Sequence, residues 1–131
     1  LVLTGTGLER LALPDGVVVK GRVPREELAS LYQRASALVF PSLYEGFGQP
    51  PLEAMACGCP VACSTAGSLP EVCGKAARYF DPTSLDELVE AVSTVLDNPE
   101  PLVERGLQRA ALFTWETCAR GHDAVYRALA A

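Results

Sequence analysis

Short apolar segments alternate with helical patterns along nearly the whole chain. Parallel strands of one sheet need a crossover between them, usually a helix, so this alternation is typical of an open sheet with helices on both faces. We therefore expect an α/β fold with a Rossmann-like parallel sheet of about five strands. The apolar segments, each bounded by turn residues, cover residues 1–4, 17–20, 37–40, 61–64 and 78–80.

Apolar residues at helical spacing fill most of the gaps between these segments. Leu28, Leu31 and Ala35 recur in this way after a proline. The gap over residues 5–15 is shorter than the roughly one dozen residues of a usual parallel crossover, so its helix is a single turn or residues are missing. We expect further helices from near Pro50, after Ser84, from Pro99 to about Phe113, and over residues 115–130.

The composition fits one globular domain. A chain of 131 residues with 49% hydrophobic residues has room for a single core, so we assign residues 1–131 to one domain. A net charge of −5 argues against the basic face that nucleic acid or anionic lipid requires, and we expect no nucleic-acid partner. No apolar run reaches the ~18 residues of a membrane span, so we expect no transmembrane segment and a cytoplasmic location.

The chain has five cysteines, whose odd number and irregular spacing do not favour a disulfide scaffold. Cys57-Gly-Cys59 followed by Cys63 also differs from the paired C-x-x-C spacing of structural zinc. We therefore expect Cys57, Cys63 and Cys73, which sit among Ala, Val and Pro, to be free and to pack as small apolar residues, and we expect no metal site.

The segment from residue 40 to residue 58, FPSLYEGFGQPPLEAMACG, contains the strongest candidate site. It reads as a strand end, a loop and the start of a helix, and ligands of open α/β sheets bind beyond the carboxyl ends of the strands. Gly46 and Gly48 allow the backbone to approach a ligand, and free N–H groups at the helix start bind hydroxyl or phosphate oxygens. Glu45 in the loop and Glu53 one turn into the helix supply acceptors for the hydroxyl groups of a polyol.

The same two glutamates also allow a structural interpretation. In that interpretation Glu53 complements the positive end of its helix, and Glu45 is a solvated loop residue. The residue pattern by itself leaves both interpretations open.

Two other features are weaker candidates. Gly5-Thr-Gly7 after the first strand lacks the third glycine and the later acidic residue of a dinucleotide site, so a nicotinamide oxidoreductase is disfavoured. His122, the only histidine, lies on the apolar stripe of the last expected helix, which favours a packing or interface role over catalysis.

The run PSLYEGFGQPPLEAMACGCPV, followed by AGSLPEVCGKAARYFDP, resembles the donor-binding domain of group 1 glycosyltransferases, in particular mannosyltransferase-like members. These are retaining enzymes of the GT-B fold that use nucleotide-sugar donors, and their signature is two glutamates eight positions apart around a G-F-G turn. The resemblance extends from VKGRVPREELASLYQRA to the ending FTWETCARGHDAVYRAL. It implies that the chain is one half of a GT-B fold, the nucleotide-sugar-binding C-terminal domain with its helix at residues 115–130.

The resemblance also implies roles for single residues. Glu45 would be the catalytic glutamate beside the donor sugar, and Glu53 would hold the ribose hydroxyls. The backbone amides from Phe47 to Gln49 would face the sugar and phosphates, with Val23 at the nucleobase and Leu52 on the ribose side. The implied donor-binding residues are Gly46, Phe47, Gly48, Gln49, Leu52, Glu53 and Val23.

The implied function is transfer of a hexose from a nucleotide-sugar donor to a glycan or lipid-linked acceptor, with no cofactor. Family members bind the donor diphosphate through an Arg and a Lys that precede the first strand seen here, and the acceptor through an N-terminal domain. We therefore expect the chain to act within a larger protein, cytoplasmic or peripheral to the membrane through that protein, and to be inactive alone. The alternative is a nucleotide-binding or partner-docking module that catalyses no transfer. Ser68 departs from the family, because a second glycine is common at its position.

Overall fold

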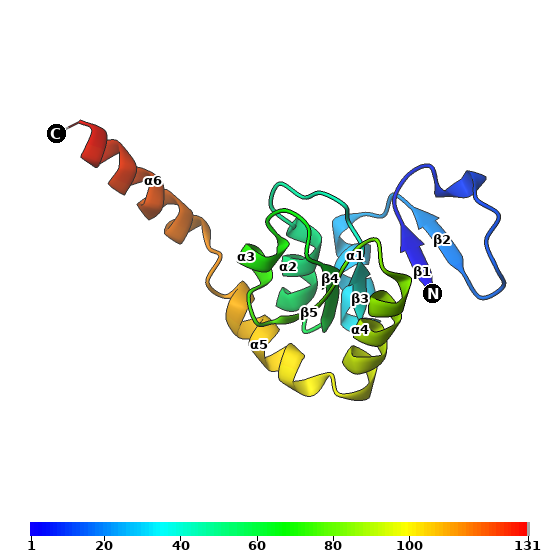
Figure 1. Ribbon diagram of the computed structural model, residues 1–131. Helices are drawn as coiled ribbons and strands as arrows, with labels where there is room; N and C mark the ends of the chain where they lie inside the picture. The colour runs from blue at the N-terminus through cyan, green and yellow to red at the C-terminus, as the bar shows by residue number, and fades with distance from the viewer. Residues whose placement is uncertain (131) are drawn as a thin grey trace.

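The computed structural model describes residues 1–130, and Figure 1 shows strands and helices alternating along the chain. The strands are β1 (Val2–Thr4), β2 (Val18–Gly21), β3 (Leu38–Phe40), β4 (Val61–Ser64) and β5 (Ala77–Phe80). The helices are α1 (Arg25–Arg34), α2 (Gln49–Ala56), α3 (Leu69–Cys73), α4 (Leu85–Asp97), α5 (Glu100–Ala110) and α6 (Trp115–Leu129), with one 3₁₀ turn, η1 (Leu8–Arg10). The α/β class is confirmed, and the short helix α3 is an addition that the sequence did not indicate.

The strands form two parallel sheets. β3, β4 and β5 lie side by side in that order, with Leu38 opposite Val61 and Val61 opposite Ala77. β1 and β2 form a separate pair, with Val2 opposite Val18. The expectation of one sheet of about five strands is therefore wrong, because an apolar pattern identifies strands but does not determine which edges hydrogen-bond.

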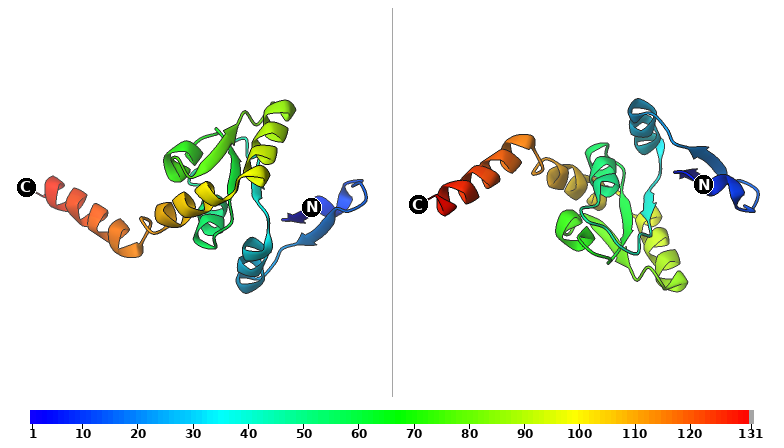
Figure 2. Two further views of the ribbon diagram at one scale, coloured as in Figure 1. Left: turned by 90° about the horizontal axis from the view of Figure 1, so that it is seen from below. Right: turned by 90° about the horizontal axis from the view of Figure 1, so that it is seen from above.

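The β1–β2 pair differs from the larger sheet in its covering. Its connection contains only η1, which matches the single-turn alternative for the short gap. One turn covers little of a sheet face, and Val2 and Val18 remain 47% and 52% exposed. Figures 1 and 2 show this pair and α6 at opposite ends of the molecule.

The β3–β5 sheet separates two apolar clusters, and successive residues of β4 point alternately into one and the other. Val61 and Cys63 lie in the cluster with α2 and α3, whereas Ala62 lies in the cluster with α4. Phe80 of β5 is the largest fully buried side chain and belongs to the second cluster. The sheet is thus the middle of three layers, and the expected helices on both faces are confirmed.

Helix α5 closes the first cluster beside α2. A Cβ at Gly106 would lie 3.2 Å from Cγ of Met55, so the glycine lets the two helices approach closely. This contact joins α5 to α2, the helix that follows the candidate loop. The part of the chain up to the end of α5 is called the body below.

Helix α6 projects from the body beyond α5 (Figures 1 and 2). It occupies the range predicted for the final helix, and the hydroxyl of its N-cap Thr114 accepts a hydrogen bond from the N–H of Thr117. No residue of α6 is buried. His122 is exposed and donates from Nδ1 to the carbonyl oxygen of Cys118 at 2.8 Å, so the packing role expected for it is not realised within residues 1–130.

None of the helices in residues 1–130 combines the length and the apolar character that a membrane crossing requires.

Candidate functional site

The candidate loop, residues 41–48, leaves the sheet at the carboxyl end of β3. A second loop, residues 65–68, leaves it at the carboxyl end of the neighbouring strand β4. Parallel strands end at the same edge of a sheet, so the two loops meet there, and the N–H of Ser68 donates to the carbonyl oxygen of Glu45 at 3.3 Å. The candidate loop therefore lies at the edge where ligands of open α/β sheets bind.

Two glycines allow these loops to pack directly against each other. Gly67 has a φ of +57°, and a Cβ there would lie 2.5 Å from the carbonyl oxygen of Glu45. Gly48 has a φ of +99°, and a Cβ there would lie 2.6 Å from Cδ2 of Leu69 in α3. At Gly67 the left-handed conformation and the close contact with backbone both require glycine, whereas at Gly48 the left-handed conformation is the main reason, because Cδ2 of Leu69 is the end of a flexible side chain. Gly48, expected from the sequence to admit a ligand, thus has a conformational reason of its own.

Ser68 attaches the candidate loop to the start of α3. Its hydroxyl lies within hydrogen-bond distance of two backbone carbonyl oxygens, 2.8 Å from that of Phe47 and 3.2 Å from that of Glu45. A glycine at this position has no hydroxyl to donate. The sequence marked Ser68 only as a departure from the family pattern, and the structure shows what its hydroxyl contacts.

Two further serines, Ser42 and Ser64, position the Glu45 carboxylate. Ser64 is fully buried, and its hydroxyl donates to the carbonyl oxygen of Ser42 at 2.6 Å. The Ser42 hydroxyl in turn lies 2.9 Å from Oε1 of Glu45. Among the described residues, no donor reaches Oε2 of Glu45, so one carboxylate oxygen is tethered and the other is available to a ligand hydroxyl.

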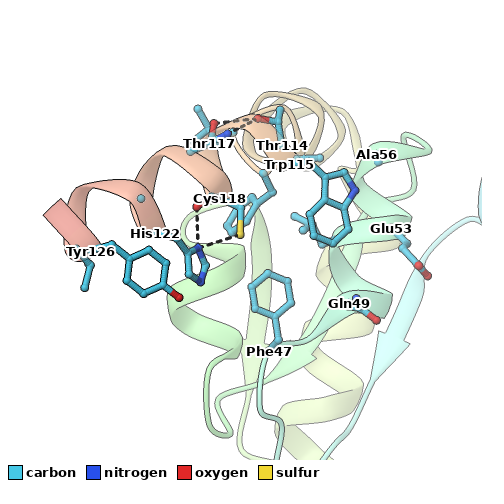
Figure 3. A pocket seen from close by; sticks show the side chains of 16 residues that line it. Phe47, Gln49, Glu53, Ala56, Thr114, Trp115, Thr117, Cys118, His122 and Tyr126 are labelled. Atoms are coloured by element: carbon cyan, nitrogen blue, oxygen red, sulfur yellow. Dashed lines mark hydrogen bonds between the residues drawn. The ribbon is translucent and has the colours of Figure 1, made fainter.

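Helix α2 begins directly after the candidate loop, with Gly48 as its N-cap and a proline in its first turn. Glu53 follows Gln49 by one turn, and Figure 3 shows both side chains leaving α2 on the same side. Burial, and after it the charge of Glu53, raises the pKa of Tyr32 to about 12. The Glu53 carboxylate therefore lies close enough to α1 to disfavour a second negative charge there.

A groove of about 1130 Å³ opens between α2, the end of α5 and α6 (Figure 3). Four of the predicted site residues line it: Phe47, Gln49, Leu52 and Glu53. The other predicted residues do not line it: Glu45, Gly46, Gly48 and Val23. The groove thus borders the candidate loop without bringing the two glutamates together on its walls.

Val23 lies away from this groove, in the short connection between β2 and α1, and is half-buried. Its place beside a nucleobase stays a prediction.

An aromatic contact ties the candidate loop to the segment that follows α5. The ring of Phe47 meets the ring of Phe113 edge to face, with centroids 5.8 Å apart. The Arg109 guanidinium lies over the ring of Phe113, 5.0 Å from its centroid. Arg109 also donates to the end of α3, from Nε to the carbonyl oxygen of Val72 at 2.8 Å and from Nη2 to that of Glu71 at 2.6 Å. Sequence reasoning missed Arg109 and Phe113, because no local pattern pairs residues so far apart in the chain.

The cysteines lie mostly in the core beneath the site. Cys59, Cys63 and Cys73 are buried, and all five cysteines are free. Burial raises the pKa of Cys59 to about 11, which keeps its side chain a neutral thiol at physiological pH. The expectation of small apolar packing is confirmed for Cys63 and Cys73, whereas Cys57 is only half-buried against the first cluster and Cys118 is exposed.

A structural comparison assigns the class. The chain superposes on sucrose-phosphate synthase from Thermosynechococcus elongatus with a TM-score of 0.78 and 34% sequence identity, over 93% of this chain and 32% of that one. Sucrose-phosphate synthase is a glycosyltransferase of the GT-B fold, so the parallel α/β architecture is that of a GT-B glycosyltransferase domain.

The family follows from the sequence. Residues 7–110 match the family model "Glycosyl transferases group 1", and the chain belongs to this family. It is 44% identical over 112 residues to O-antigen chain mannosyltransferase B of Escherichia coli. The matched region covers 83% of this chain and 29% of that protein. The chain is 40% identical over 126 residues to the MMP alpha-(1->4)-mannosyltransferase of Mycolicibacterium hassiacum, covering 91% and 31%. The chain thus spans about three tenths of the length of these two relatives.

Proposed function

We propose that this chain is the donor-binding domain of a retaining glycosyltransferase that transfers a hexose from a nucleotide-sugar to a glycan or lipid-linked acceptor. The names of two relatives favour mannose as the hexose. The rest of the protein would supply the acceptor site, and the enzyme would work in the cytoplasm or at the membrane surface.

The observation that carries this proposal is the fixed geometry of the candidate loop at the carboxyl edge of β3 and β4. Gly67 and Ser68 contact the backbone of Glu45 from one side, and Ser42 tethers one oxygen of its carboxylate. A site that is rigid before the ligand arrives loses less conformational entropy on binding. Residues that bind a polyol with defined hydroxyl positions benefit from this rigidity.

The two glutamates divide the donor between them in this proposal. Glu53, one turn into α2, accepts hydrogen bonds from the ribose hydroxyls, and the backbone amides from Phe47 to Gln49 face the sugar and phosphates. Glu45 accepts hydrogen bonds from the sugar hydroxyls, orients the sugar and stabilises the positive charge that develops at its anomeric carbon. Glu45 orients and stabilises in this scheme and forms no bond to the sugar.

The substitution Glu53→Ala tests the ribose role. We expect it to weaken binding of a nucleoside diphosphate by about 1–3 kcal/mol, because a charged acceptor to two hydroxyls is lost. Isothermal titration of folded wild type and variant measures the difference. Unchanged affinity in a folded variant would remove Glu53 from the ribose site.

The substitution Glu45→Gln in the full-length protein tests whether the two glutamates bind different parts of the donor. We expect it to lower kcat more than it weakens nucleoside diphosphate binding, since its partner is the sugar and its charge acts near the transition state. Equal losses of nucleoside diphosphate affinity in the Glu45 and Glu53 variants would contradict the division. Binding without turnover of any nucleotide-sugar by the wild-type protein would favour the alternative, a binding module without catalytic activity.

A further inference from the structure

We propose that Ser68, Arg109 and Phe113, together called the α3 clamp, are positioning residues that hold the Glu45–Gly48 loop in its active geometry. The proposal rests on the proposed function, because it assigns that loop to the donor. None of the three residues belongs to the two-glutamate motif, and two of them come from beyond β5 in the chain.

The clamp holds the backbone of the loop through Ser68. The hydroxyl of Ser68 contacts the carbonyl oxygens of Phe47 and Glu45, and its N–H donates to the second of these. The loop residues on either side of Gly46 are therefore fastened to the first turn of α3 through their own main chain. A Cβ at Gly46 itself would meet no heavy atom within 4 Å, so this position has no close packing contact in that direction.

The clamp holds the side chain of Phe47 through Phe113. Edge-to-face contact between the two rings fixes the rotamer of Phe47, although both rings are partly exposed, 44% for Phe47 and 37% for Phe113. The guanidinium of Arg109 covers a face of the Phe113 ring, which fixes that ring in turn.

Helix α3 connects the two halves of the clamp. It is only five residues long, so its two ends lie within a few ångströms of each other. Ser68 stands at its start, and Arg109 donates to the carbonyl oxygens of Glu71 and Val72 near its end. The contacts form a closed circuit from the Phe47 carbonyl through Ser68, α3, Arg109 and Phe113 back to the Phe47 ring. A closed circuit implies that loosening either half releases the same loop.

Three variants separate positioning from general stability. Phe113→Leu keeps an apolar side chain but removes the ring, and Ser68→Ala removes the hydroxyl. Phe80→Leu is the matched control, because the same chemical change falls at a fully buried ring in the cluster on the other face of the sheet. Thermal unfolding of the full-length protein should show the largest loss of stability for the Phe80 variant, since its ring is the most buried.

Limited proteolysis measures release of the loop without any donor. Leu43, Tyr44 and Phe47 are exposed chymotrypsin sites in and beside the loop. We expect cleavage at residues 43–47, mapped by mass spectrometry in the full-length protein under native conditions, to become about fivefold faster in the Phe113 and Ser68 variants. The Phe80 variant should cleave there at the wild-type rate. Unchanged cleavage in the Phe113 variant, or equal acceleration in the control, would overturn the proposal.

A double-mutant cycle on kcat/KM for the nucleotide-sugar donor tests the closed circuit. We expect about a fivefold loss in each clamp variant, and a combined loss in the double variant well below the 25-fold product of the two, because both release one loop. Multiplicative losses would overturn the circuit, whereas multiplicative losses are expected when the Phe113 and Phe80 changes are combined. If the wild-type protein turns over no donor, the proposed function fails, and the proteolysis result still decides whether the clamp exists.

Discussion

The candidate loop and helix α6 both lie at the surface, but different kinds of interaction stabilise them. The loop is held by contacts between segments distant in sequence, from Gly67 and Ser68 after β4 and from Phe113 after α5. Helix α6 is stabilised by neighbours within the helix itself, such as the ion pair of 2.7 Å between Arg127 and Asp123. We therefore expect that losing one contact with a segment distant in sequence loosens the loop. Losing a contact within α6 should change that helix alone.

The exposure of α6 sharpens this contrast. Its aromatic residues are among the most exposed in the chain, with Trp115 at 90% and Tyr126 at 68%. A helix of 15 residues is close to the length at which isolated helices are marginal in water, so capping and i, i+4 pairs matter to it more than packing does. The body, by contrast, is held mainly by burial of apolar side chains.

The largest expected loss of stability is that of Gly67→Ala, a change at the contact between the candidate loop and the loop after β4. The alanine must adopt a positive φ and place its Cβ against the backbone oxygen of Glu45, so we expect the free energy of unfolding to fall by about 2–4 kcal/mol. Urea denaturation measures this loss.

Gly46→Ala is the matched control in the facing loop. No heavy atom lies within 4 Å of a Cβ there, and its φ is not positive, so we expect a change below about 0.5 kcal/mol. Similar losses in both variants would show that the two loops are not packed as described.

Alkaline pH is expected to lower the free energy of unfolding of the body, by an amount between those of the glycine variants. The pKa of Tyr32 is about 12 in the folded protein and about 10 in the unfolded chain, so the unfolded state loses its proton first as the pH rises. The stability that the neutral phenol contributes is complete below pH 10 and is lost between about pH 10 and 12.

We therefore expect Tyr32→Phe to reduce the slope of unfolding free energy against pH in that window. Tyr126→Phe in α6 is the matched control, at an exposed ring. Equal changes of slope in the two variants would contradict the assignment of Tyr32 to the buried core.

The smallest expected effect is that of Gly121→Ala in α6. A Cβ there meets nothing within 4 Å, and alanine favours helix over glycine by about 0.5–1 kcal/mol. Circular dichroism should show slightly more helix, while the urea midpoint of the body stays at its wild-type value. A lower midpoint would mean that α6 packs against the body more closely than its exposure indicates.

Local patterns predicted the elements of the fold well. The strand at residues 61–64 was predicted at its observed bounds, because a short apolar run between turn residues has few alternatives. The division into two sheets and the five-residue helix α3 were not predictable from the same information. Edge pairing depends on contacts between distant segments, and a helix of one turn has no periodicity to detect.

The site shows the same limit. Glu45 and Glu53 were identified from a local motif, and their roles remain proposals. Ser68 was noticed only because it replaces a glycine, while Arg109 and Phe113 were not identified as residues of the site. Their contacts join residues that α3 and α5 bring together, which no window of local sequence contains.

The central claim is that a nucleotide-sugar binds at the candidate loop and the first turn of α2. Hydrogen exchange of the chain, measured by mass spectrometry with and without a panel of nucleoside-diphosphate hexoses, tests this claim most directly. We predict slower exchange over residues 45–53 in the presence of the donor, because backbone amides there would bind its oxygens. Protection confined to α6 or to the Gly5-Thr-Gly7 turn, or no protection by any donor, would contradict the account.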